Sequence, residues 1–130
     1  GKSDGAKQFA ARLYQVMKDK GLVRDERGGY LPFEPVFYKE LDLSVCKDEY
    51  NINTILGTPQ GIKGGPGVLP TALKQGTRVY HFDEFRRGHP RILTALGNLF
   101  SSGTITDEAT QETVKCKPAT FFILSANLDD

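Results

Sequence analysis

Two adjacent carboxylates, Asp83 and Glu84, follow a short β-prone run at residues 78–82. Nucleotide hydrolysis needs one carboxylate to hold Mg²⁺, usually through its waters, because magnesium prefers octahedral oxygen ligands and dehydrates reluctantly. It also needs a second carboxylate to orient and polarise the attacking water. We therefore expect Asp83 to hold the metal and Glu84 to act on the water. The alternative is a strand that ends in a solvated acidic turn, since short motifs often match by chance.

A candidate phosphate-binding segment lies at the N-terminus, just before a helical pattern. In the pattern GxxxxGK[ST], glycines let backbone N–H groups close around phosphates, and the helix N-terminus adds its dipole. Gly1 and Lys7 match this pattern, whereas Ala6 replaces the second glycine and Gln8 replaces the hydroxyl residue that ligates Mg²⁺. Lys7 could instead be an ordinary lysine in the first turn of a helix. The candidate cofactor-binding residues are Gly1, Gly5, Ala6, Lys7, Gln8 and Asp83.

The elements that must position these residues alternate between helix and strand. Apolar spacing predicts helices over 9–20, 47–56, 68–75 and 90–100, strands over 36–43, 78–82 and 119–124, and a hairpin from 104–106 and 112–115. This alternation favours an α/β sandwich with a mostly parallel sheet. Sites in such sheets lie at the carboxyl ends of strands, so the acidic pair and Asn127 are expected on one rim. The almost wholly apolar run at 119–124 suits a strand buried on both faces.

Composition narrows the class of protein. The 130 residues suffice for one domain, and a net charge of +1 gives no reason to expect nucleic acid as a partner. No apolar run approaches the ~20 residues that span a bilayer. Cys46 and Cys116 form no CxxC pair, which indicates reduced thiols inside a cell. Of the two histidines, His81 is expected to pack within a strand and His89 to begin a helix.

From Leu41 onward the sequence resembles the Clp/ClpB disaggregase and unfoldase family of AAA+ ATPases. The resemblance is carried by LDLSVCKDEY, ILGTPQGIKGG, the run from Val79 to Val114 and TFFILSAN, and it is weakest over residues 19–35. The step from Asp83-Glu84 to His89-Pro90 is its most specific feature. The resemblance implies a three-layer P-loop NTPase sandwich. Residues 1–130 would be the large subdomain from P-loop to sensor 1, incomplete at both ends and without the lid subdomain.

The resemblance also implies roles for single residues. The acidic pair would be the Walker B motif and the N-terminal segment a degenerate Walker A motif, with Lys7 on the β- and γ-phosphates of ATP. Asn127 would be the sensor 1 residue that helps Glu84 to position water. The loop residues Gly61, Ile62, Lys63 and Gly64 match the family's substrate-gripping loop. That loop usually carries an aromatic residue where Ile62 stands, and it is shorter here, so a flexible connection is the alternative.

Three interpretations of function remain open at this point. The first is an ATP- and Mg²⁺-dependent motor that remodels or unfolds a protein client as a ring homo- or hetero-oligomer, in the cytoplasm or an organelle matrix. The second is a nucleotide-binding or catalytically weakened subunit with a structural role in an assembly, supported by the departures at Ala6, Gln8 and Ile62. The third is a fragment with no activity alone. Whether ATP is hydrolysed or only bound stays open.

Overall fold

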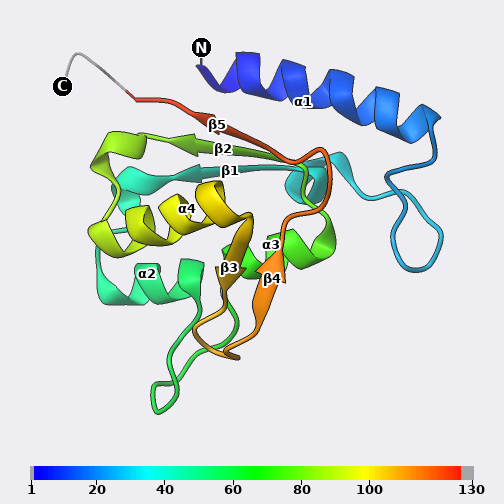
Figure 1. Cartoon of the computed structure of the whole chain (residues 1–130). Coiled ribbons are helices and arrows are strands. Elements are labelled where there is room, and N and C mark those ends of the chain that lie inside the picture. Colours follow the sequence, from blue (N-terminus) through cyan, green and yellow to red (C-terminus); the bar gives the residue numbers. More distant parts are fainter. Residues whose placement is uncertain (1, 127–130) are drawn as a thin grey trace.

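A parallel sheet organises residues 2–126, which are the residues that the computed structural model describes (Figure 1). Its three described strands are β1 (Tyr38–Asp42), β2 (Val79–Asp83) and β5 (Phe121–Leu124), in the order β1-β2-β5. Both neighbouring pairs are parallel. A separate antiparallel hairpin consists of β3 (Thr104–Thr106) and β4 (Thr113–Lys115). The predicted strands and hairpin are thus present.

Helices cover both faces of the sheet. Figure 1 shows α1 (Lys2–Asp19) on one side and α2 (Glu49–Leu56), α3 (Val68–Gln75) and α4 (Pro90–Ser102) on the other. Because successive strand residues point to opposite faces, Val79 packs with the α1 cluster and Tyr80 with the cluster beneath α2, α3 and α4. The α/β class with a mostly parallel sheet is therefore confirmed. None of the described helices is long and apolar enough to cross a membrane.

Local sequence signals explain where the helices begin and end. Pro90 occupies the start of α4, and the His89 ring accepts a hydrogen bond from the Arg91 backbone N–H at 3.1 Å. Gly103, with φ +74°, ends the same helix. At α2, the Asp48 side chain accepts from the Asn51 N–H at 2.8 Å. The predicted places of α2 and α4 are confirmed to within two residues at each end.

Two expectations about where elements begin, and one about burial, are wrong. Helix α1 begins at Lys2 instead of residue 9, since Ala6 and Ala10 bury against the sheet and Asp4 suits the first turn. Strand β1 begins at Tyr38 instead of residue 36, because an irregular helical segment occupies Phe33–Phe37. Strand β5 is not buried on both faces. It is the edge of the described sheet, and its ends Phe121 and Leu124 are 41% and 45% exposed.

The loop between α2 and α3 is closed at its base by a tight fit around Asp107. This buried carboxylate accepts the N–H of Gly67 at 3.0 Å and the N–H of Ala109 at 2.9 Å. A Cβ added at Gly57 would collide with the Asp107 carboxylate and lie 2.8 Å from the Ala109 nitrogen. Gly57 also has φ +103°, which side-chain-bearing residues rarely adopt. Glycine is therefore required at position 57.

We expect Gly57→Ala to lower the free energy of unfolding by roughly 2–4 kcal/mol, because strain and a steric clash add at a buried site. The matched control is Gly97→Ala within α4, where an added Cβ meets nothing within 4 Å. The control should be neutral or stabilising by up to about 1 kcal/mol. Chemical denaturation of both variants measures the difference. Equal midpoints would contradict the proposed fit around Asp107.

Candidate functional site

The carboxyl ends of the strands align at one rim of the sheet. Asp42 at the end of β1 pairs in register with Asp83 at the end of β2, and Phe82 pairs with Leu124 of β5. Ser125, directly after β5, donates its N–H to the Phe82 carbonyl at 3.1 Å and accepts the Phe85 N–H at 2.9 Å. The backbone of Ser125 is therefore hydrogen-bonded to the residue before the acidic pair and to the residue after it. Such rims are the usual ligand sites of parallel α/β sheets.

Glu84 lies in a strained turn immediately after β2. Its φ of 55° and ψ of 43° place a non-glycine residue in the left-handed region, which costs roughly 1–3 kcal/mol and is found most often at functional sites. Its N–H donates to Asp83 Oδ1 at 2.9 Å. Its own carboxylate lies 3.6 Å from the Arg87 Nε, and the side chain is 21% exposed. The turn gives the two carboxylates different surroundings, as two different roles require.

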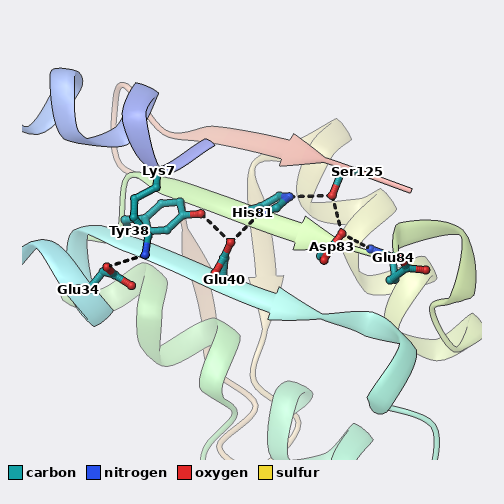
Figure 2. A network of polar contacts seen from close by, with 8 residues as sticks. All are labelled: Lys7, Glu34, Tyr38, Glu40, His81, Asp83, Glu84 and Ser125. Atoms are coloured by element: carbon teal, nitrogen blue, oxygen red, sulfur yellow. Dashed lines mark hydrogen bonds and ion pairs between the residues drawn. The ribbon is translucent and has the colours of Figure 1, made fainter. Parts of the chain in front are cut away.

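Asp83 is held by a chain of polar contacts that runs back along the sheet (Figure 2). Ser125 Oγ donates to Asp83 Oδ1 at 2.7 Å, and His81 Nε2 lies 2.7 Å from the same Ser125 oxygen. On the other side of the ring, His81 Nδ1 lies 3.0 Å from Glu40 Oε1, which also accepts the Tyr38 hydroxyl at 3.0 Å. This network connects β1, β2 and the residue after β5.

This network was not predicted from the sequence. His81 was expected to pack within a strand, and no role was expected for Ser125, Glu40 or Tyr38. His81 is indeed fully buried, but both of its ring nitrogens have polar partners. One signal was available: a histidine stands two residues before the acidic pair in an otherwise apolar strand. A residue of that type at that spacing faces the same side of the sheet as Asp83.

The candidate phosphate-binding residues lie apart from the acidic pair. Gly5, Ala6, Lys7 and Gln8 are helical residues of α1, so the open loop expected from the sequence is wrong for this segment. Lys7 Nζ lies 3.3 Å from Glu34 Oε1, with both side chains about half exposed. Figure 2 shows Lys7 turned toward Glu34 and away from Asp83 and Glu84. Gly1 and Asn127 lie outside the described residues, and their roles remain predictions.

The candidate substrate loop, Gly61, Ile62, Lys63 and Gly64, lies between α2 and α3. Figure 1 shows this connection projecting beyond the helices, at a distance from the rim with Asp83. The Ile62 side chain is 50% exposed. It lines a surface hollow together with Tyr50 of α2, which is 79% exposed. An apolar side chain and an aromatic ring are thus both presented to solvent at the same hollow.

The acidic side chains at this rim suit a magnesium ion and not a cage of protein ligands. Within residues 2–126, no group of three or more His, Cys, Asp or Glu side chains could hold a metal. Magnesium needs no such cage, because it is commonly bound by one or two carboxylates together with substrate phosphates. Asp83 fits that requirement, since the hydrogen bonds from the Glu84 N–H and from Ser125 Oγ are both accepted by Oδ1 and not by Oδ2.

Comparison with known proteins gives consistent relatives. The chain is 32% identical to the human mitochondrial disaggregase over 131 aligned positions, which cover 98% of the chain and 16% of that protein. It is 33% identical over 70 positions to the chloroplastic chaperone protein ClpD of Arabidopsis thaliana, covering 52% of the chain and 7% of that protein. The chain thus spans only about a sixth of the length of the disaggregase. No protein-family model matches the chain.

A solved structure matches the fold along nearly the whole chain. It is a closed-state cryo-EM reconstruction of Hsp104 with ATPγS and FITC casein, with a TM-score of 0.74 and 25% sequence identity. The match covers 98% of this chain and 19% of that chain.

Proposed function

Because this chain is a module of the Clp/ClpB-type AAA+ proteins, we propose that the full-length protein is an ATP-dependent motor that remodels or unfolds other proteins. The observation that supports this most directly is the position of the acidic pair. Asp83 ends the central described strand of a parallel sheet, and Glu84 follows it in a strained turn at the rim. One carboxylate that can hold a metal and a second that can activate water are therefore adjacent at this rim, as hydrolysis of ATP requires.

Each residue of the site has a proposed task. Asp83 holds Mg²⁺ through its water shell, and Glu84 orients and polarises the attacking water. When bound, Mg²⁺ neutralises charge on the phosphates of ATP. Asn127 assists Glu84 with the water, and Lys7 contacts the β- and γ-phosphates. The remaining residues of the proposed phosphate contact are Gly1, Gly5, Ala6 and Gln8.

Lys7 must leave Glu34 in order to reach a phosphate. The cost is small, because an ion pair between half-exposed side chains contributes roughly 0–1 kcal/mol. The ion pair does not therefore exclude a phosphate-binding role for Lys7.

The partners follow from the same family. We propose that the protein assembles with other AAA+ subunits into a ring and acts on a protein client. The Hsp104 reconstruction, described with ATPγS and casein, supports both an ATP-type ligand and a polypeptide substrate. The relatives named for mitochondria and chloroplasts support a place inside the cell, in an organelle matrix or the cytoplasm.

The substrate contact is proposed at Gly61, Ile62, Lys63 and Gly64. Ile62 supplies the apolar side chain, and the neighbouring Tyr50 supplies the aromatic surface that the loop lacks. Burying an isoleucine side chain against a polypeptide is worth roughly 1.5–3 kcal/mol. This suffices for a weak, repeated grip on an extended chain of varied sequence.

We expect Ile62→Ala to slow ATP-driven unfolding of a folded client protein roughly tenfold, because most of the apolar contact is removed. ATP turnover without client should be unchanged, since the loop lies apart from Asp83 and Glu84. The matched control is Gln60→Ala in the same loop, which should unfold the same client at the normal rate. Normal unfolding by Ile62→Ala would show that the loop does not grip the client.

A second function is favoured by a specific observation. Lys7 pairs with Glu34, and the segment around it is helical instead of an open loop. Together with Ala6 and Gln8, these features suit a subunit that binds nucleotide weakly and serves an assembly structurally. ATP turnover that depends on Glu84 would exclude this alternative.

A further inference from the structure

His81 stands in the middle of β2, where an apolar residue would pack at lower cost. Its neighbours Tyr80 and Phe82 belong to the core, and its own side chain is 0% exposed. Burying a polar group costs roughly 1–3 kcal/mol unless its hydrogen bonds are made. Both nitrogens have partners here, Ser125 Oγ at 2.7 Å and Glu40 Oε1 at 3.0 Å. The buried ring is therefore hydrogen-bonded at both nitrogens, and it connects Glu40 on β1 to Ser125 after β5.

The single hydroxyl proton of Ser125 decides which of its two hydrogen bonds it donates and which it accepts. The hydroxyl has one proton, and an ionised Asp83 carboxylate can only accept. Ser125 therefore donates to Asp83 Oδ1 and accepts a hydrogen bond from His81 Nε2. The contact between His81 Nδ1 and the Glu40 carboxylate needs a proton on Nδ1 as well, so the ring acts as a donor at both nitrogens. A leucine or phenylalanine at position 81 could not supply this donor.

The far end of this chain of contacts is anchored on β1. Glu40 is the register partner of His81, and its Oε1 accepts the Tyr38 hydroxyl. Burial, followed by the hydrogen bond to Glu40, raises the pKa of Tyr38 above its ordinary value. His81 and Asp83 are two residues apart on β2 and share one face of the sheet. The paired strands β1 and β2 thus hold Glu40 and Asp83, the two ends of this chain of contacts.

We propose that His81 is a positioning residue for the nucleotide site, acting through Ser125 to fix the Asp83 carboxylate in the orientation that serves Mg²⁺ with ATP (Figure 2). This rests on the proposed function, which gives Asp83 that task. Asp83 Oδ1 receives hydrogen bonds from Ser125 Oγ and from the Glu84 N–H, so the carboxylate cannot rotate without losing both. A metal ligand must be held in a fixed orientation by the residues that are hydrogen-bonded to it, and Ser125 and the Glu84 N–H do this for Asp83.

The test measures binding of a fluorescent ATP analogue to the full-length protein, once with Mg²⁺ and once with EDTA. We expect His81→Leu and Ser125→Ala each to weaken binding with Mg²⁺ roughly tenfold, the lower limit for losing a group that orients a metal ligand. Binding in EDTA should be unchanged. His81→Gln keeps an N–H donor and Ser125→Thr keeps the hydroxyl, so both should bind nearly as the unmodified protein does. The double variant should lose no more than either single one, because both changes interrupt one path.

Each other outcome has a defined meaning. Equal losses with Mg²⁺ and with EDTA, or no loss in either, would overturn the positioning role while leaving the proposed function intact. Failure of the unmodified protein to bind ATP would overturn both. Thermal unfolding checks that the variants fold. If His81→Leu does not fold, His81→Phe, which also lacks the donor, takes its place in the comparison with His81→Gln.

Discussion

Glu84→Gln in the full-length protein should reduce ATP turnover by roughly 10²–10⁴-fold, the range for loss of a general base. Glutamine keeps the size and the oxygen of the side chain but cannot take a proton from water. The turn that places Glu84 depends on the backbone at φ 55°, which this change does not alter. ATP binding should therefore persist while hydrolysis stops, and steady-state turnover beside nucleotide affinity measures both.

The control for this change is Glu26→Gln, an exposed glutamate in the loop after α1. It removes the same charge far from the rim and should leave turnover unchanged. Turnover that survives Glu84→Gln would mean that Glu84 is not the group that activates water. Loss of binding together with turnover would instead indicate damage to the site as a whole.

Asp83→Asn is expected to remove most of the Mg²⁺-dependent part of ATP affinity. The asparagine oxygen can still accept from Ser125 and from the Glu84 N–H, as Asp83 Oδ1 does at 2.7 and 2.9 Å. Its NH₂ group then replaces Oδ2, and a donor cannot accept hydrogen bonds from the waters around Mg²⁺. We expect affinity with Mg²⁺ to fall roughly 10–100-fold and affinity in EDTA to stay the same.

Asp42→Asn is a close control, because Asp42 ends β1 in register with Asp83. Its carboxylate accepts from the Ser44 N–H and hydroxyl, so it caps a short turn and has no proposed contact with nucleotide. Isothermal titration with and without Mg²⁺ compares the two variants. If Asp42→Asn reduced Mg²⁺-dependent binding as much as Asp83→Asn, the assignment of the metal to Asp83 would be wrong.

The features that sequence analysis predicted correctly are those governed by local signals. The start of α4 follows from Pro90 and its end from Gly103, both of which act within one turn of helix. The placement of Asp83-Glu84 at a strand end follows from a β-prone run that stops at an acidic pair. Strand pairing then brought Ser125 to the same rim, as parallel topology requires.

The features that it missed depend on contacts between distant residues. Ser125 lies 44 positions from His81, and Glu40 lies 41 positions away, so their contacts appear only once register is known. The early start of α1 depends on Ala6 and Ala10 packing against the sheet, which overrides the loop suggested by the motif. The exposure of Phe121 and Leu124 depends on the place of β5 at the edge of the described sheet.

We propose that Asp83 and Glu84 form the working half of an ATP site in a protein-remodelling motor. The most direct test is ATP binding and turnover by the full-length protein, with and without Mg²⁺, beside Glu84→Gln. Mg²⁺ should strengthen binding, and Glu84→Gln should reduce turnover roughly 10²–10⁴-fold. Undetectable binding at millimolar ATP would contradict this proposal.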